Sequence, residues 1–347
     1  MKTYRFTERG VKHKLRGLDN QDASVVLSHG PHAFAFMADG MGSARCGDEA
    51  ANIAVEAATD AVGRLFMPLD GVDNLSGKLV IRAAFPAAYN AIQRAAENEE
   101  DLNELLTTFM AVYYNERTRR LHFGYCGDGA VLVMLTDGSV KLLTAAQKGA
   151  THSQTTQLLD YGAWDFRAEG DVRAFMMLTD GLFDALCPNG ALPEADPSRM
   201  KALRLLLESP LGMNDPRMRP YLDQAFSSDG DNDDLGALFE CVGDDRSVVI
   251  VSADKRLCVG EPAEEDFAVN DVSPKPCTPS APRAASVRVP SASSALRTPG
   301  ISSSSDFLRP LSPDECEQVR FLIGAFRDSH QVRRFKKKAG VSHACAH

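Results

Sequence analysis

Long apolar runs are absent from this sequence. Nowhere do its 347 residues contain the roughly 18 uninterrupted apolar residues that a membrane-spanning helix requires. The segment MKTYRFTERGVKHKLRG at the start of the sequence also lacks the apolar stretch of a secretory signal peptide. We therefore expect a cytoplasmic protein without a transmembrane segment.

Closely spaced cysteines are missing too, because the eight cysteines include no C-x-x-C pair. The sequence predicts neither a zinc knuckle nor a disulfide framework, and reduced thiols are the simpler interpretation. Positive charge is also scarce, since the formal net charge is -9. Clustered Lys and Arg supply most of the affinity for a phosphate backbone, so we expect no nucleic-acid partner. An acidic chain suits a cation site.

Apolar residues make up 44% of the chain, which is enough for a large buried core. Short runs rich in β-branched and aromatic residues predict strands at 23–28, 33–38, 108–114, 121–126, 131–135, 173–178 and 247–252. Apolar residues at helical spacing predict long helices at 46–66 and 78–97, and shorter ones at 197–207 and 217–226.

This order of elements predicts an α+β fold. Strands, a helix pair and then more strands joined by tight turns favour mainly antiparallel sheets covered by helices. Pro86 is expected to kink the second long helix or to mark a break in it. The polar, Asp-rich segment 187–243 is interpreted as a peripheral excursion outside the core.

The composition changes after Lys255, which predicts a domain over residues 1–255. Residues 256–311 are rich in Ser, Pro and Ala and lack periodicity, so they predict a disordered linker. Ser312 then begins a capping box, and an amphipathic basic helix and tail are predicted over 312–347. The helix either docks to a partner, such as a Ser/Thr kinase, or folds back on the domain.

Four acidic motifs lie beside strongly apolar strands. They are DNQD at 19–22, FMADGMG at 36–42, MLTDGLFD at 177–184 and GDDRSVVIV at 243–251. Asp-Gly is also a common turn dipeptide, so one such pair alone favours a turn. Asp137 fits that interpretation, because it joins two alternating strands as a hairpin would, and we assign it no function.

Asp39 and Asp180 differ from a simple turn residue because each follows a nearly continuous apolar run. Such a run predicts a strand buried on both faces. A carboxylate placed there is costly unless a cation or hydrogen bonds compensate its charge. Hard cations such as Mg²⁺ and Mn²⁺ prefer carboxylate, carbonyl and water oxygens, which fits convergent aspartates.

Six motifs in order resemble those of the PP2C-like, or PPM, family of metal-dependent phosphatases, bacterial type. They are NQD ending at Asp22, DGMGSARCGDEAAN from Asp39, TTFMAVYY from Thr107, CGDGAVLVML from Cys126, LTDGLFD from Leu178 and DDRSVVIV from Asp244. The resemblance covers roughly residues 1–255. It implies a four-layer α-β-β-α sandwich with two central antiparallel sheets, and a dinuclear site at one end.

The resemblance also implies roles for individual residues. Asp39 would bridge two Mn²⁺ or Mg²⁺ ions, the Gly40 carbonyl would bind one of them, and further ligands would be Asp22, Asp180 and Asp244. Asp128 and Asp184 match the positions that hold a third metal in some bacterial members. A water activated by the metals would then hydrolyse phosphoserine or phosphothreonine without a phosphoenzyme intermediate.

Arg16 is the candidate phosphate ligand, because a guanidinium can donate two parallel hydrogen bonds to a phosphate. In the family this arginine usually lies one residue closer to the aspartate at position 22, so Lys14 or His13 could share or take the role. Met41 stands where some eukaryotic relatives have a histidine, so a water must protonate the leaving group.

Two other functions remain open at this point. A catalytically weak scaffold of the same fold would bind phosphorylated proteins without turnover, although all five inner-shell positions are present. A related phosphatase could act on a sigma-factor regulator or a small phosphate ester instead. Phosphorylated signalling proteins are the substrates that the resemblance favours.

Overall fold

The structure is a computed structural model, and it describes residues 1–66, 77–147, 155–228, 236–239 and 242–253. The domain predicted over residues 1–255 falls almost entirely within these ranges. The linker predicted at 256–311 and the helix and tail predicted at 312–347 lie outside the described residues.

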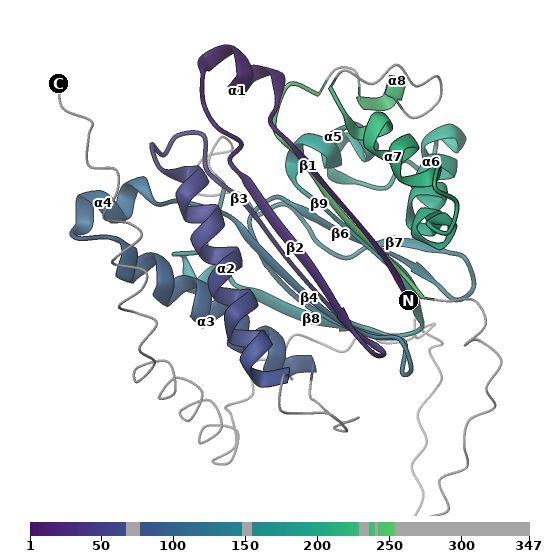
Figure 1. The fold of residues 1–347 in the computed structure, drawn as a ribbon, viewed down its shortest axis with the longest axis horizontal. Coiled ribbons are helices and arrows are strands. Elements are labelled where there is room, and N and C mark those ends of the chain that lie inside the picture. The colour runs from purple at the N-terminus through teal and green to yellow at the C-terminus, as the bar shows by residue number, and fades with distance from the viewer. Residues whose placement is uncertain (67–76, 148–154, 229–235, 240–241, 254–347) are drawn as a thin grey trace, which may run out of the picture.

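Two five-stranded antiparallel sheets stack between layers of helices (Figure 1). The first sheet has the order β1 (Lys2–Glu8), β10 (Arg246–Ser252), β9 (Val172–Leu178), β6 (Ala130–Leu135) and β7 (Val140–Leu142). The second has the order β2 (Asp22–His29), β3 (His32–Asp39), β4 (Phe109–Asn115), β5 (Arg120–Cys126) and β8 (Asp165–Glu169). The edge strands β1 and β2 contact each other.

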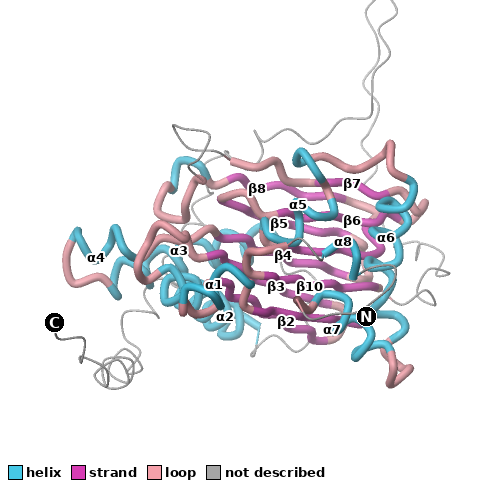
Figure 2. The backbone as a smooth tube through the Cα atoms, turned by 90° about the horizontal axis from the view of Figure 1, so that it is seen from above, coloured by secondary structure: helices cyan, strands magenta, loops and turns pink. Residues whose placement is uncertain are grey.

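Helices cover the outer faces of both sheets, on opposite sides of the molecule in Figures 1 and 2. The second sheet is covered by α2 (Gly47–Phe66) and α3 (Gly77–Ala95). The first is covered by α5 (Asp180–Leu186), α6 (Pro197–Glu208), α7 (Met218–Phe226) and α8 (Gly236–Phe239). Two short helices, α1 (Val11–Arg16) and α4 (Glu99–Glu104), lie in connections. The four-layer α-β-β-α sandwich expected from the sequence is confirmed.

Each central strand contributes to two apolar layers. In β3, Phe34 and Phe36 pack toward α2 and α3, whereas Ala35 and Met37 pack between the sheets. Successive side chains of a strand point to opposite faces, and here both faces are covered. This double burial explains the continuous apolar runs of the sequence in strands that are antiparallel.

All seven strands predicted from sequence are present, with ends that differ by at most one residue. The Asp137 hairpin is also confirmed: its carboxylate accepts a hydrogen bond from the Ser139 amide at 2.8 Å, and Gly138 has a φ of 83°. The edge strands β1 and β8 were not predicted. Their sequences, KTYRFTE and DFRAE, are polar because their side chains are less completely buried.

Pro86 was expected to kink α3 or to mark a break in it, and the break is not observed, because α3 runs continuously from Gly77 to Ala95. Proline removes one backbone donor from a helix interior, at a cost of about 3 kcal/mol. The neighbouring side chains of Phe85, Ala84 and Ala88 are buried against the second sheet. Their burial offsets the local cost and keeps the helix in one piece.

The interpretation of residues 187–243 as a peripheral excursion was wrong. Their helices form the outer layer over the first sheet, where Leu203, Leu206 and Phe226 are fully buried. Arg246, at the start of β10, is also buried and donates hydrogen bonds to the carbonyls of Phe226, Phe239 and Val242. Polar loops between these short helices make the segment as a whole polar in composition, so its contribution to the core was not recognised from the sequence.

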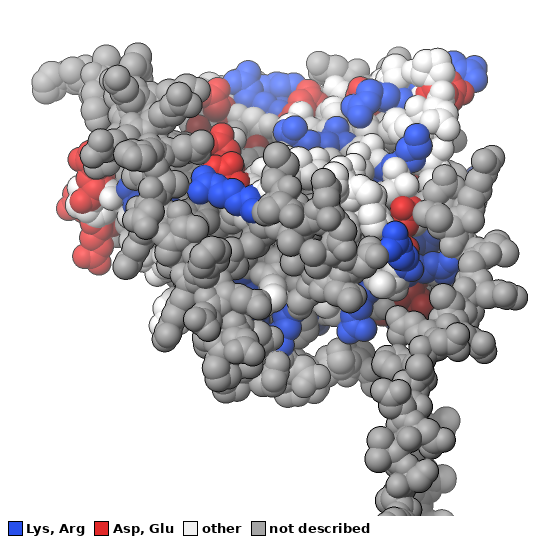
Figure 3. Space-filling view, turned by 60° about the horizontal axis from the view of Figure 1, so that its bottom comes forward, with Lys and Arg blue, Asp and Glu red and all other residues white. Residues whose placement is uncertain are grey.

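No helix among the described residues is both long enough and apolar enough to cross a membrane. On the face shown in Figure 3, acidic side chains gather at the left, where α4 has the sequence EEDLNE. Elsewhere on the described part of that face, Lys and Arg are interspersed with acidic and uncharged residues.

Candidate metal centre

Six aspartates predicted as metal ligands come from strand ends, loops and the helix α5 at the end of the sandwich that carries α1, which is at the top in Figure 1. Asp22 begins β2 and Asp39 ends β3, and the two are direct partners in the antiparallel ladder. Directly opposed residues have Cβ atoms about 5 Å apart on the same face. The pairing of β2 with β3 therefore brings two carboxylates together.

The first sheet delivers two more carboxylates to the same end. Asp180 begins α5 immediately after β9, and Asp244 lies just before β10. Because β9 and β10 are neighbours, with Leu178 opposite Val248, their ends lie together. Asp184 follows one turn after Asp180 on α5, and Asp128 lies in the connection between β5 and β6.

The electrostatics confirm that these groups are close. Burial raises the pKa of Asp39 well above its usual range, and the charges of Asp22, Asp180 and Asp128 raise it further. Burial likewise raises the pKa of Asp180 to about 6, with contributions from Asp128, Asp244 and Asp184. Each of the other predicted aspartates therefore interacts electrostatically with Asp39 or with Asp180.

Asp22 is the most deeply buried of the group, at 5% exposure. Its pKa is raised well above the usual range, first by burial and then by the charges of Asp245 and Asp180. Its Oδ2 accepts a hydrogen bond from the Thr179 hydroxyl at 2.8 Å, whereas Oδ1 has no hydrogen-bond partner among the described residues. A buried carboxylate oxygen without a donor is costly, and a cation would compensate it.

The charge of Asp180 is among the causes that raise the pKa of Asp39. A cation beside these two carboxylates would offset their repulsion. Among the described residues, no three His, Cys, Asp or Glu side chains are arranged as a ready-made metal-binding group. Even so, the donor set of carboxylates with one orphaned buried oxygen fits a hard divalent cation.

The backbone around Asp39 is held by two threonines that the sequence interpretation did not assign. Thr107 Oγ1 donates to the Asp39 carbonyl at 2.9 Å, and the Asp39 amide donates to Thr108 Oγ1 at 3.0 Å. Gly40 continues the chain against the start of α2, where an added Cβ would lie 2.3 Å from the backbone of Gly47. A side chain at position 40 would therefore push the Asp39 loop away from α2.

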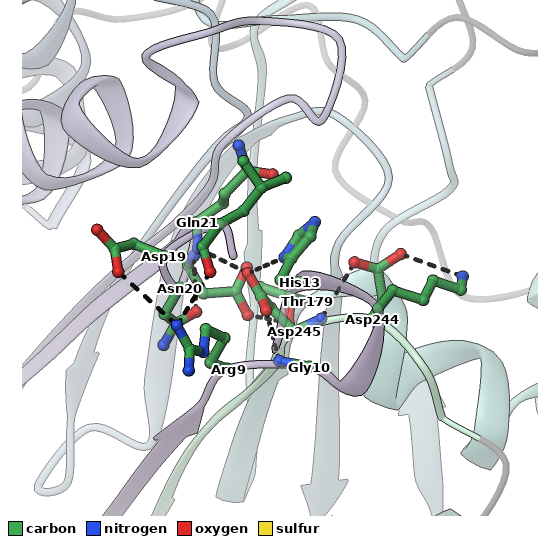
Figure 4. Close-up of polar contacts among 12 residues, drawn as sticks. Arg9, Gly10, His13, Asp19, Asn20, Gln21, Thr179, Asp244 and Asp245 are labelled. Carbon is green, nitrogen blue, oxygen red and sulfur yellow. Dashed lines mark hydrogen bonds and ion pairs between the residues drawn. The ribbon is translucent and has the colours of Figure 1, made fainter. Parts of the chain in front are cut away.

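Asp245 is a second residue that sequence reasoning missed. It is buried and accepts hydrogen bonds from the amides of Gly10 and Gln21, each at 2.6 Å (Figure 4). Its Oδ2 also lies 2.8 Å from His13 Nδ1. Asp245 therefore ties α1 and the Gln21–Asp22 segment to β10. The only available signal was its place beside Asp244 at the start of an apolar strand.

The candidates for phosphate binding lie on α1 in different surroundings. His13 is buried against Asp245, and Lys14 donates to Glu8 at 2.8 Å and to Ser228 at 2.8 Å. Arg16 ends the helix with an exposed side chain. Lys12, which the sequence interpretation did not consider, has its ammonium 3.6 Å from Asp244 Oδ2. Lys12 therefore lies beside one of the predicted metal ligands, whereas Lys14 pairs with Glu8 instead.

Solved structures with a similar fold include a bacterial serine phosphatase and serine/threonine phosphatases. A point variant of a bacterial serine phosphatase has a TM-score of 0.51 and 13% identity, covering 74% of this chain and 99% of that one. The catalytic domain of PstP with two manganese ions has a TM-score of 0.49 and 19% identity, covering 73% and 98%. Stp1 from Staphylococcus aureus has a TM-score of 0.46 and 13% identity, covering 73% and 96%. The first of these matches shows that the chain has the same fold.

The family model for protein phosphatase 2C matches residues 9–210, which is more than half of the chain. The chain therefore belongs to the protein phosphatase 2C family, as the order of its motifs indicated. A search of curated proteins found no match.

Proposed function

We propose that this protein is a metal-dependent phosphatase that hydrolyses phosphoserine and phosphothreonine in proteins. The observation that carries the proposal is the convergence of six aspartates at one end of a protein phosphatase 2C sandwich, with burial and mutual repulsion raising the pKa values of three of them. Natural proteins seldom maintain so costly a cluster unless a cation compensates it.

In this proposal Asp39 and the Gly40 carbonyl hold two Mn²⁺ or Mg²⁺ ions together with Asp22, Asp180 and Asp244. Asp128 and Asp184 hold a third ion. Such cations lower the pKa of a bound water and offset the negative charge that develops on the phosphoryl oxygens. Thr155 donates to Asp128 at 2.6 Å and would orient it.

Other residues in this proposal bind the substrate phosphate or orient the metal ligands. Arg16 binds the substrate phosphate, and its place on α1 is maintained by the contacts of His13 and Gly10 with Asp245. Thr179 orients Asp22 through its hydroxyl. A solvent water protonates the leaving alkoxide, since Met41 has no proton to donate. We further propose a cytoplasmic signalling role, with a Ser/Thr kinase as a partner of the C-terminal tail.

The test is phosphate release from a phosphothreonine peptide with Mn²⁺, with Mg²⁺ and with excess EDTA. Asp39→Asn is compared with Asp137→Asn, which makes the same chemical change in an exposed hairpin turn. We expect metal-dependent release that is lost in Asp39→Asn and retained in Asp137→Asn. No release by the folded wild-type protein with either metal would reject catalysis and favour a phospho-binding scaffold.

A further inference from the structure

A groove of about 560 Å³ begins at the aspartate cluster and follows the seam between the two sheets. One end is formed by Asp22 and Asn20, and the floor continues along β2 through Val25. The wall on one side is β1, through Arg5 and Thr7. The other wall is one face of α2, formed by Asn52, Val55, Glu56, Thr59 and Asp60. Figure 1 shows α2, β2 and β1 running side by side here.

The dimensions of the groove suit a short extended peptide. From Asn52 to Asp60 the α2 wall rises by about 12 Å, at 1.5 Å per residue. An extended chain covers that distance in about three or four residues, at roughly 3.3 Å each. A peptide whose phosphorylated residue lies at the aspartates can therefore place the next few residues along the groove.

The floor of the groove is the edge of β2. Among the described strands, β2 forms a ladder only with β3, and its other edge lies beside β1 at the seam. Asp22, Ala23 and Ser24 are almost fully buried there, whereas Glu56 and Asp60 on the α2 wall are exposed. We therefore expect the α2 wall to make most of the contacts with an occupant.

The charges of the lining would supply the sequence preference. Apart from Asp22, which is a predicted metal ligand, the groove is lined by two carboxylates, on Glu56 and Asp60, and by a single guanidinium, on Arg5. The Arg5 Nε donates to Ser24 Oγ at 3.1 Å across the seam. The groove as a whole favours a cationic occupant.

Glu56 and Asp60 are exposed on the same face of α2, one helical turn apart. Asp60 Oδ2 lies 3.7 Å from the Arg64 guanidinium, an exposed pair of the kind that contributes little. Both carboxylates can therefore accept an incoming guanidinium or ammonium group.

We propose that this groove binds the extended segment that flanks the phosphorylated residue of a substrate protein, and that Glu56 and Asp60 recognise an Arg or Lys side chain about two to four residues from it. The inference rests on the proposed phosphatase function for its substrate class. It adds a specificity determinant that is separate from the aspartate cluster.

The test uses the full chain and a set of phosphothreonine peptides in which a single Arg is moved along an Ala background. For the wild-type protein, we expect Arg at one or more positions to lower the KM relative to the all-Ala peptide. For the same Arg peptide, the double variant Glu56→Gln/Asp60→Asn should have a KM about five-fold higher than the wild type, which is the upper range for exposed ion pairs. The KM for the all-Ala peptide and hydrolysis of p-nitrophenyl phosphate should stay unchanged. Glu56→Lys should reverse the preference toward a Glu-containing peptide.

The matched control is the double variant Glu97→Gln/Glu100→Gln, which removes the same charge from two exposed residues, one just before α4 and one in it, that do not line the groove. Equal loss of Arg preference in this control would reject the groove and indicate a general charge effect. Absence of any Arg preference in the wild-type protein, with normal hydrolysis of the small ester, would also reject it.

A binding measurement separates this inference from the proposed function. Labelled peptides carrying a non-hydrolysable phosphonate are titrated by fluorescence anisotropy. The groove is supported if the Arg peptide binds more tightly than the Ala peptide and loses that advantage in the double variant Glu56→Gln/Asp60→Asn. If no ester is hydrolysed in the same preparation, the phosphatase function is rejected while binding in the groove is retained. Equal binding of the two peptides overturns the groove.

Discussion

Replacing Asp180 with Asn should stabilise the metal-free protein at alkaline pH. Burial and the neighbouring aspartates raise its pKa from 3.8 to about 6. A carboxyl group whose pKa is raised by folding favours the folded state while it is protonated, and this advantage is lost as the pH rises through the folded pKa. The ionised group therefore destabilises the protein above that pH.

The size of the effect follows from the shift. At 1.36 kcal/mol per pKa unit, the rise to about 6 costs about 3 kcal/mol at pH 8. The same linkage leaves a cost of about 1 kcal/mol at pH 4.5, where Asp180 is largely protonated in the folded state. For a domain of this size, about 3 kcal/mol corresponds to a rise in Tm of roughly 6–12 °C.

The assay is denaturant unfolding of wild type and Asp180→Asn in EDTA at pH 8 and pH 4.5, with Asp137→Asn as control. We expect a gain for Asp180→Asn that is about three times larger at pH 8, and little change for the control. With Mn²⁺ the order should reverse, because the variant loses a ligand. A gain that is equal at both pH values, or a loss in EDTA at pH 8, would refute the electrostatic reasoning.

Two further predictions follow from the contacts around the aspartates. Thr179→Val removes the hydroxyl that donates to Asp22 and should weaken Mn²⁺ binding at least ten-fold, as measured by calorimetry. Thr179→Ser keeps a hydroxyl and should retain most of the affinity, so equal affinities in the two variants would contradict this prediction. Gly40→Ala places a Cβ 2.3 Å from backbone atoms of Gly47 and should lower both the Tm and the rate of phosphate release. The control Gly63→Ala, in open space on α2, should leave the Tm unchanged or raise it slightly. A Gly40→Ala protein with unchanged Tm and activity would show that the loop adjusts to the added methyl group.

Much of the fold was predictable from the sequence because the central strands are buried on both faces. The runs in β3, β4 and β9 are almost entirely apolar, so their positions could be identified without knowledge of the sheet order. The edge strands β1 and β8 carry polar residues and gave no comparable signal. The helices of residues 187–243 were predicted in part, but their packing on the first sheet was not. An amphipathic pattern shows that a helix has an apolar face, but it does not indicate which surface that face packs against.

Some residues of the candidate site could likewise be predicted from the sequence, and others could not. Asp22, Asp39, Asp180 and Asp244 could be singled out because each lies beside an apolar strand. Asp245, Thr179 and Thr107 could not, because their roles depend on hydrogen bonds between segments far apart in the sequence: 157 residues separate Thr179 from Asp22, and 224 separate Asp245 from Gln21.

The sequence by itself determined where the central strands lie, which aspartates lie beside them and which family the motifs resemble. These are local properties, since an apolar run and an adjacent carboxylate can be identified within ten residues. Only the tertiary structure decided that β2 lies against β1 at the seam, that Asp245 ties α1 to β10, and that α2 faces a groove leading away from the aspartates. Those features come from the pairing of distant strands, and the pairing depends on how all the apolar faces are buried together.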